Sequence, residues 1–236
     1  VRPEVLSGLL AVEPPHGWVL KPQREYRFEL KTGESREFTF SLTASVKNIE
    51  SSNYGTVKIL LDQRPDILRL PLNFVGGFRW LVSKVYREPL SLNASFPPEK
   101  YANSLEPGEG WKAVSWPENA LEIEPLFEGK PGITYLRHFI YSPDERKAII
   151  GVPNNSRMRL WLNGRIIHET RKIVPLRPNY GGDGANYTKT ILKKGWNHIM
   201  IKILREEKPI EAHFTIAHEK WNRGMSDITQ HKFPWE

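Results

Sequence analysis

The chain has 236 residues, 34 Lys and Arg against 27 Asp and Glu, a formal net charge of +7 and no cysteine. The absence of cysteine excludes disulfides, thiolate metal sites, iron–sulfur clusters and cysteine nucleophiles. A hydrophobic share of 39% argues against disorder, and the apolar runs are far shorter than the roughly 20 residues of a membrane-spanning helix. We therefore expect a soluble protein with packed cores. Because the chain begins at Val1 without a leader, we expect a processed product or a fragment.

Alternating apolar residues predict β-strands along most of the chain. These segments are residues 24–30, 36–42, 56–61, 67–74, 78–85, 133–141, 147–152, 157–162, 165–169, 187–192, 196–204 and 211–217. The first two are predicted to form a hairpin across the turn at 31–34. Residues 97–109 hold the single helical candidate. Asn163-Gly164 predicts a type I′ turn, which needs positive φ at both positions.

A domain boundary is predicted at Gly76-Gly77, where a first set of strands ends and the charge balance changes. Residues 1–76 carry a net charge of +1 and residues 77–236 a net charge of +6. The excess is concentrated in residues 137–208, with 15 basic and 6 acidic side chains. The predicted fold class is all-β, with two tandem β-sandwiches.

The first 75 residues carry short motifs of a known kind of domain. These are Glu13-Pro14-Pro15-His16-Gly17-Trp18-Val19, Gly33-Glu34-Ser35, Phe38-Thr39-Phe40 and Tyr54-Gly55. The stretch resembles the immunoglobulin-like accessory domains found beside bacterial carbohydrate-active enzymes. The resemblance implies an immunoglobulin-like β-sandwich at 1–76 that acts as a spacer and packing partner.

Residues 77–236 carry a second set of motifs. These are Phe78-Arg79-Trp80-Leu81-Val82, Phe96-Pro97-Pro98-Glu99, Tyr135-Leu136-Arg137, Leu160-Trp161-Leu162-Asn163-Gly164 and the run from Leu192 to Lys202. They are similar to the galactose-binding-like jelly rolls, of the carbohydrate-binding-module type, appended to bacterial glycoside hydrolases. The resemblance implies two antiparallel sheets, a carbohydrate-binding or purely structural role, a catalytic domain in the parent chain, and an extracellular or periplasmic location. The absence of cysteine fits a cytoplasmic location equally.

No cofactor and no metal site is expected. In related β-domains of the anthrax protective antigen type, the loop before the tryptophan strand carries adjacent aspartates that hold calcium. Here the loop at 152–156 has Asn154 and Asn155 in their place. Neutral amides bind a hard cation less well than carboxylates do, which argues against a calcium-dependent sugar site.

No catalytic signature is present, so we expect a protein that is not an enzyme. The acidic pairs Asp144-Glu145 and Glu206-Glu207 lie in polar turns, where solvated charge is the ordinary state. The cations of 137–208 are spread over strands and turns without a basic helix or an RNA-recognition pattern. We therefore expect neither nucleic-acid nor membrane binding, and acidic glycans are the polyanions to test first.

The candidate ligand-binding residues fall in two segments. The loop at 177–187 offers Asn179, Tyr180, Asp183, Asn186 and Tyr187, which combine sugar-stacking rings with hydrogen-bonding groups. The alternative is that it merely connects two strands.

Trp111 and Trp116, in a segment rich in Gly and Pro, form the second candidate. The alternative is that they fill one end of the sandwich or the domain junction. The leading hypothesis is thus a non-catalytic accessory module of an exported bacterial hydrolase that binds carbohydrate. Its rival is a structural module without a ligand, which packs on a catalytic domain or on a second copy through Trp221, Phe233 and Trp235.

Overall fold

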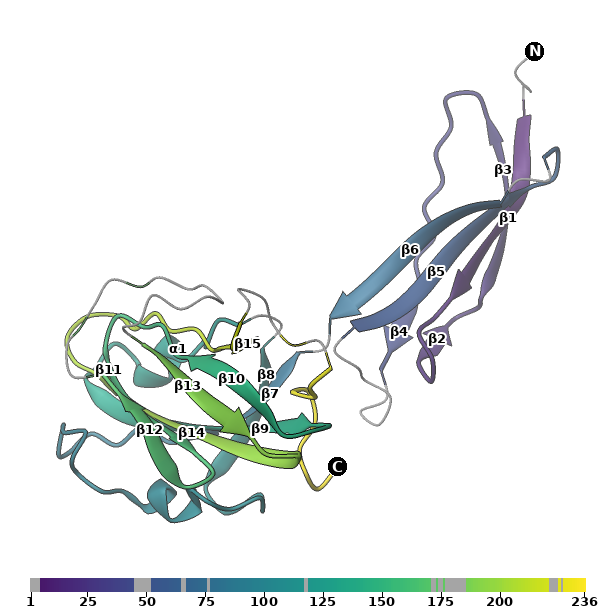
Figure 1. Ribbon diagram of the computed structural model, residues 1–236. Helices are drawn as coiled ribbons and strands as arrows, with labels where there is room; N and C mark the ends of the chain where they lie inside the picture. The colour runs from purple at the N-terminus through teal and green to yellow at the C-terminus, as the bar shows by residue number, and fades with distance from the viewer. Residues whose placement is uncertain are drawn as a thin grey trace. The chain divides into compact units, whose positions relative to one another are not determined.

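The computed structural model describes residues 5–44, 52–64, 67–75, 77–116, 119–170, 173, 176, 186–220, 225 and 227–236. The chain divides into two compact units, Val1–Gly76 and Gly77–Glu236, called unit 1 and unit 2 below. Strands dominate both units (Figure 1). The helices of the described residues are the 3-10 turn η2 (Pro97–Tyr101) and α1 (Glu124–Phe127), and neither has the length to cross a membrane. The prediction of an all-β sandwich fold is confirmed.

Unit 1 contains a four-stranded sheet in the order β3-β1-β5-β6 and a two-stranded sheet of β2 and β4. Its strands are β1 (Val5–Glu13), β2 (Val19–Lys21), β3 (Glu25–Lys31), β4 (Ser41–Thr43), β5 (Ser52–Leu61) and β6 (Ile67–Val75). The buried apolar side chains of its described residues are Val12, Phe28 and Val57. Unit 1 therefore has a small core.

The hairpin predicted between 24–30 and 36–42 is wrong, although its turn is present. Gly33 has a φ of 87°, and the Glu34 amide donates to the Lys31 carbonyl at 3.0 Å. However, β3 pairs with β1 along its whole length, and β4 is short and pairs with β2. The sequence analysis missed β1, which pairs with every residue of β3 and thereby takes the place of the local hairpin partner.

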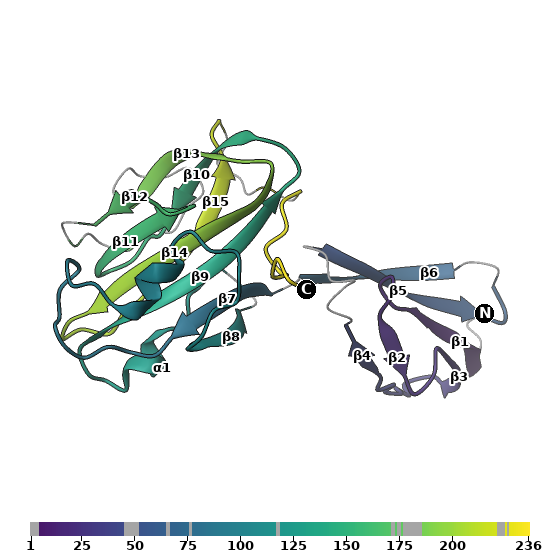
Figure 2. The ribbon, with the colours of Figure 1, turned by 90° about the horizontal axis from the view of Figure 1, so that it is seen from below.

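Unit 2 contains a six-stranded sheet in the order β12-β11-β14-β9-β7-β8 and a three-stranded sheet in the order β13-β10-β15. Figure 2 shows these strands from a second direction. The strands are β7 (Phe78–Ser83), β8 (Trp111–Trp116), β9 (Gly132–Ser142), β10 (Arg146–Gly151), β11 (Arg157–Leu162), β12 (Arg165–Glu169), β13 (Tyr187–Leu192), β14 (Gly195–Arg205) and β15 (Thr215–His218). Residues 111–116, for which the sequence analysis predicted no strand, thus form an edge strand.

The six-stranded sheet is covered on both faces. On β9, Leu136 and Ile140 belong to the large core, which also includes Ile150 of the three-stranded sheet. Tyr135 and Phe139, which alternate with them, belong to two further clusters on the opposite face. We call this opposite face the outer face. Residues 84–110, between β7 and β8, cover much of it and contribute apolar side chains to its clusters.

Candidate functional site

The covering segment 84–110 and the first residue of β8 surround an open hollow in unit 2. We call it the aromatic hollow, and its volume is about 380 Å³. It is lined by Lys84, Tyr86, Pro97, Pro98, Lys100, Tyr101, Glu109, Gly110 and Trp111. Three aromatic rings, two cations and one carboxylate therefore converge on one small space.

Each ring of the aromatic hollow is placed by a different backbone feature. Tyr86 forms an isolated bridge with Ile133, with two backbone hydrogen bonds of 2.8 Å. Tyr101 is the last residue of η2, a turn that Pro97 and Pro98 initiate. Trp111 is the first residue of β8. All three side chains are half-buried, so each keeps some surface for a ligand.

Neighbouring rings hold these aromatic side chains in position. The ring of Tyr86 lies 4.7 Å from that of Phe96, and Tyr101 lies edge-on to Trp111 at 6.1 Å. Such tilted and edge-on pairs are the favoured arrangements of aromatic rings. The indole Nε1 of Trp111 is buried without a hydrogen-bond partner among the described residues. Trp111 therefore offers ring surface rather than a hydrogen bond.

The polar groups at the hollow are tyrosine hydroxyls and three exposed charged side chains. The hydroxyl of Tyr101 accepts a hydrogen bond from the Glu109 amide at 3.0 Å, which lowers the pKa of Tyr101. No described residue accepts the hydroxyl's own proton, so Tyr101 can donate it to a ligand. Burial raises the pKa of Tyr86. Lys84, Lys100 and Glu109 are exposed at the rim and can donate to or accept from hydroxyl groups.

A buried arginine fixes one end of the covering segment. Arg137 on β9 has an exposed fraction of 0%, and its guanidinium donates to the carbonyls of Ser104, Glu106 and Pro107 at 2.7–2.9 Å. Its Nε donates to Nε2 of His198 at 3.0 Å. Burial lowers the pKa of Arg137 to about 10, so the group stays charged at neutral pH.

The arginine also supports the rings of the aromatic hollow. The guanidinium of Arg137 lies 5.2 Å from the ring centres of both Tyr101 and Trp111. Cation–π contact of this kind is strongest when the cation is desolvated, as it is here. The same residue therefore holds the backbone and the rings of one wall.

A buried lysine fixes the other end of the covering segment. Lys202 on β14 is fully buried and donates to the carbonyls of Leu92 and Ala94 and, at 3.0 Å, to the carboxylate of Glu99. Burial alone would raise the pKa of Glu99, but hydrogen bonds from Tyr135 and Lys202 outweigh it and lower that pKa. The cation and the carboxylate therefore stabilise each other's charged form beneath the hollow.

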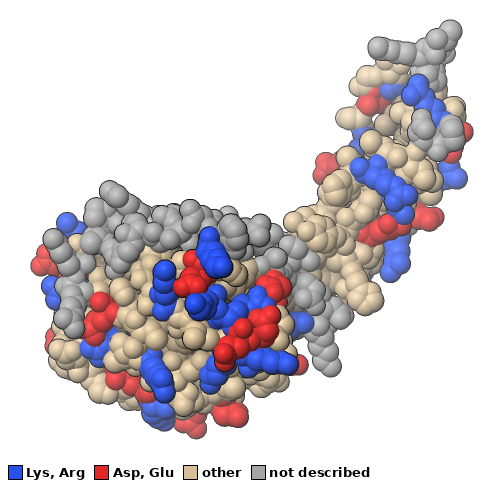
Figure 3. Space-filling model, in the orientation of Figure 1, with Lys and Arg blue, Asp and Glu red and all other residues tan. Residues whose placement is uncertain are grey.

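The sequence analysis missed both anchoring cations, because it considered the basic excess of 137–208 only as exposed charge that could bind polyanions. Charged side chains do spread over the visible face of unit 2, with acidic and basic groups intermixed (Figure 3). Arg137 and Lys202 are nevertheless internal. A signal existed, since each is a single charge inside an apolar strand, and such positions can face a covered surface.

The structure separates the candidate ligand residues instead of bringing them together. Trp116 is 6% exposed and packs in the core with its ring 5.9 Å from Trp80, so the prediction of a ligand-binding role for Trp116 is corrected to a core role. It packs there because β8 pairs with β7 and places Trp116 at its buried end. Trp111, at the other end of β8, lines the aromatic hollow.

The second predicted segment is only partly described. Asn179, Tyr180 and Asp183 lie outside the described residues. Asn186 is 3% exposed, and its side-chain oxygen accepts from Thr170 at 2.6 Å, which makes it a framework residue rather than a ligand. Tyr187 is half-buried on β13, and its ring packs over Gly151, where a Cβ would lie 2.3 Å from the ring. Tyr187 is thus the first residue of β13 in the three-stranded sheet, and Asn186 directly precedes it.

The amides that replace the calcium-binding aspartates have structural partners. The side chain of Asn154 donates to the Val152 carbonyl at 2.6 Å and accepts from the Ser156 amide at 2.9 Å. The side chain of Asn155 donates to the Pro209 carbonyl and accepts from the Glu211 amide. Within the described ranges, His, Asp and Glu form no cluster of three that could hold a metal ion.

The C-terminal aromatics that the structure describes pack on unit 2 itself. The ring of Trp235 stacks on Phe233 at 4.9 Å and lies edge-on to Phe139 at 5.2 Å. Phe233 is 3% exposed, whereas Trp235 and Tyr141 each remain 39% exposed. Trp221 lies outside the described residues.

No protein-family model matches the chain, and neither does any curated protein. Among solved structures it is similar to a β-glucosidase from Kluyveromyces marxianus, at 12% identity and a TM-score of 0.38, over 58% of this chain and 14% of that one. The chain is also similar to an anti-sigma factor domain-containing protein, at 10% identity and a TM-score of 0.40, over 99% of this chain and 81% of that one. A third similar structure is the epithelial adhesin 9 A domain from Candida glabrata, solved in complex with Galb1-4GlcNAc. It has 8% identity and a TM-score of 0.28, over 60% of this chain and 80% of that one. All three scores lie below 0.5, so none of them assigns a function to this chain.

Proposed function

We propose that the chain is a non-catalytic carbohydrate-binding module whose site is the aromatic hollow. The observation that carries the proposal is the convergence of Tyr86, Tyr101 and Trp111 on one space of about 380 Å³. Sugars present faces of C–H groups that pack against aromatic rings, and their hydroxyls need nearby donors and acceptors. The volume falls within the range of about 300 to 1,000 Å³ that is usual for ligand sites.

Rigidity of the hollow supports the same proposal. Arg137 and Lys202 tie both ends of the covering segment to β9 and β14, so its backbone is already ordered before a ligand arrives. A site that needs no ordering loses less conformational entropy on binding. The attachment to a hydrolase, the absence of catalysis and the export from a bacterial cell remain predictions from the resemblance.

The proposal predicts salt-insensitive retention on a glycan array, with neutral and acidic oligosaccharides as probes. The double variant Tyr86→Leu with Tyr101→Leu keeps apolar bulk but removes two rings, and we expect the affinity to fall by about tenfold or more. Tyr141→Leu is the matched control, since Tyr141 is a half-exposed tyrosine of β9 outside the hollow. We expect it to bind as the unaltered chain does.

Two outcomes would contradict the assignment. Failure of the unaltered chain to bind any glycan would exclude carbohydrate binding. The second outcome is that the double variant Tyr180→Ala with Tyr187→Ala loses glycan binding while the double leucine variant keeps it. This result would assign the glycan site to the loop at 177–187 instead of the hollow. Thermal unfolding of each variant checks that the fold is intact.

A structural module remains the second candidate function. The half-exposed rings of Trp235 and Tyr141 favour it, because Tyr141 also contacts Trp196 at 5.5 Å and together they offer apolar surface. Under this alternative the chain binds no glycan and self-associates, and sedimentation velocity would show loss of assembly in Trp235→Ala.

A further inference from the structure

A second hollow of unit 2 lies where the edge strands of its two sheets meet. β12 is the last strand of the six-stranded sheet, β13 is the last strand of the three-stranded sheet, and the two lie side by side (Figures 1 and 2). We call the hollow beside them the basic groove. It has a volume of about 720 Å³ and is lined by Asn103, Leu162, Asn163, Arg165, Ile167, Lys189, Thr190, Ile191 and Lys193.

The charge of the basic groove has one sign. Arg165, Lys189 and Lys193 are exposed, and the described lining contains no Asp or Glu. Lys189 has a distant acidic neighbour, Glu219 at 4.0 Å, whereas Arg165 and Lys193 form no ion pair with a described residue. Cations brought together in a concave site raise the local concentration of anions.

Buried amides hold the two turns that carry Arg165 and Lys193. The side chain of Asn197, 0% exposed, accepts from the Lys193 amide at 3.0 Å and donates to the Lys193 carbonyl at 2.8 Å. It also accepts from the side chain of Asn163 at 3.0 Å, and Asn163 in turn accepts from the His198 amide. The turn between β11 and β12 is therefore locked to the turn between β13 and β14.

The covering segment supplies the third wall of the groove. The Ala102 carbonyl accepts from Nδ1 of His198 at 2.9 Å, and the Ser104 carbonyl accepts from Arg137, so Asn103 lies between two anchored residues. Gly164, with a φ of 81°, lets Asn103 approach closely, because a Cβ there would lie 2.7 Å from that of Asn103. The amide of Asn103 thus stays at the groove as a further donor.

The remaining lining combines an apolar floor with one hydroxyl. Leu162 and Ile167 contribute apolar surface, Ile191 is 54% exposed, and Thr190 contributes a hydroxyl. A ligand with a hydrophobic or C–H face and one anionic group would satisfy both parts of the groove.

We propose that the basic groove is a binding site for an oxyanion, of the carboxylate or sulfate kind that acidic saccharides carry. It is separate from the aromatic hollow and rests on different residues, so it stands whether or not the hollow binds a sugar. Arg165 and Lys193 donate charge-assisted hydrogen bonds to the anion, and Lys189 adds long-range attraction.

The test uses NMR titration of the full chain with sodium sulfate, a galacturonate oligosaccharide and a neutral oligosaccharide. We expect saturable shifts of the amides at 163–167 and 189–193 with sulfate, with galacturonate or with both, and weaker binding at higher sodium chloride concentration because salt screens exposed charges. The titration that shifts these amides, with sulfate or with galacturonate, identifies whether the groove prefers a sulfate or a carboxylate. The neutral oligosaccharide should leave these amides unchanged.

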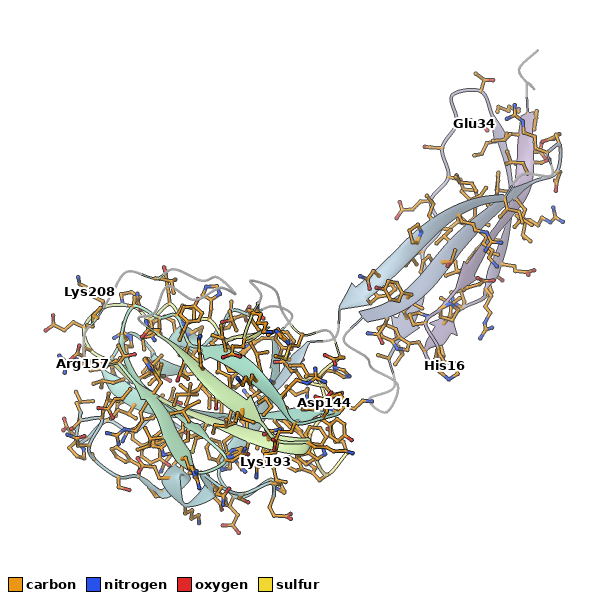
Figure 4. The ribbon with its side chains drawn as sticks, in the orientation of Figure 1. His16, Glu34, Asp144, Arg157, Lys193 and Lys208 are labelled. Carbon is orange, nitrogen blue, oxygen red and sulfur yellow. The ribbon has the colours of Figure 1, made fainter. Side chains whose placement is uncertain are left out.

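The variant Arg165→Gln with Lys193→Gln should weaken the anion affinity by about tenfold or more, since a hydrogen bond to a charged group is stronger than one to a neutral group. Arg157→Gln with Lys208→Gln is the matched control. It removes one Arg and one Lys that do not line the groove, and Figure 4 labels both of them together with Lys193.

Three results would overturn the proposal: no shift with either anion, equal loss in both double variants, or shifts that spread over the whole surface. The exchanged side chains are exposed, so all variants are expected to fold. An unchanged thermal unfolding midpoint verifies this.

Discussion

Arg137 and Arg157 belong to the same sandwich, yet they are in opposite environments. Arg137 is completely buried, whereas the side chain of Arg157 is 49% exposed at the start of β11. The buried guanidinium has no carboxylate partner among the described residues and is instead satisfied by three carbonyls, one imidazole and aromatic rings. A planar fork with several donors suits this set of acceptors, and an ammonium group cannot reproduce it.

Arg137→Lys keeps the charge and removes the fork. We expect it to lower the free energy of unfolding of unit 2 by about 2 kcal/mol, since some carbonyls and the imidazole of His198 lose their donors. Denaturant unfolding measures the change, with the exposed Arg157→Lys as control, expected within about 0.5 kcal/mol of the unaltered chain. Equal effects of the two substitutions would show that the buried hydrogen bonds contribute little.

At the scale of elements, the covering segment 84–110 has little regular structure but still has a defined position. Its one helical element is the 3-10 turn η2, and side chains of β9 and β14 attach it to the sheet. Two glycines near its C-terminal end have backbone conformations that favour glycine, and one of them also packs against a ring of the aromatic hollow. Gly108 and Gly110 have φ values of 73° and 78°, and only Gly108 is in contact with the ring of Tyr101.

Gly108→Ala and Gly110→Ala should therefore have the same backbone cost but different effects on the hollow. Each places a side chain at positive φ, which costs about 1 to 2 kcal/mol. A Cβ at Gly108 would also lie 2.6 Å from the ring of Tyr101 and displace it, whereas a Cβ at Gly110 meets nothing within 4 Å. If the hollow is the glycan site, as proposed, Gly108→Ala should weaken glycan binding more than Gly110→Ala does, because only the first displaces the ring of Tyr101, and titration calorimetry measures both affinities. Equal glycan affinity of the two variants would contradict a role for Tyr101.

At the scale of the whole molecule, the two units differ in the size of their cores. Unit 1 buries Val12, Phe28 and Val57 among its described residues, whereas the buried residues of the large core of unit 2 come from every strand of its two sheets except the edge strand β12. Unit 2 also buries the polar side chains of Arg137, His138 and His198. A small unit that buries less apolar surface has a smaller margin of stability. The labelled His16 belongs to unit 1 and is exposed (Figure 4).

The chain should unfold in two thermal transitions, of which the one belonging to unit 2 depends on pH. Burial lowers the pKa of His138 to about 4 and that of His198 to about 3, from an ordinary value of 6.5. Between pH 6.5 and about 4 the unfolded chain therefore binds more protons than the folded unit, and its stability falls as the pH falls. Glu99 and Glu124, whose pKa values are lowered, add to this loss only at more acidic pH.

Differential scanning calorimetry at several pH values between 7.5 and 4.5 measures both transitions. The groups that face His138 are the Arg79 carbonyl and Gln230, and those that face His198 are Arg137 and the Ala102 carbonyl. None of them is an acid that could stabilise a protonated imidazole. In the variant His138→Asn, the midpoint of the unit 2 transition should change less with pH, because one buried imidazole no longer titrates on unfolding. A midpoint that stays constant down to pH 5 would show that these imidazoles titrate normally.

Much of the fold follows from local patterns. The alternation of apolar residues located β9, β11, β12 and β14 to within one or two residues, and the turn at Asn163-Gly164 forms with φ values of 50° and 81°. β8 was missed, because its Gly- and Pro-rich surroundings resemble a loop. Of the predicted site residues, Trp111 lies at the aromatic hollow, Trp116 lies in the core, Tyr187 begins β13 of the three-stranded sheet, and Asn186 directly precedes that strand.

By itself, the sequence determined the all-β class, most strands and the absence of disulfides, because a period of two residues and the lack of cysteine are local properties. Only the tertiary structure decided that the outer face of the large sheet is covered, that Arg137 and Lys202 are therefore buried, and that Tyr86, Tyr101 and Trp111 meet. It likewise decided that cations from β12 and from the end of β13 line one groove. These facts depend on contacts between segments far apart in the chain, and alternation along one strand carries no information about what packs against it.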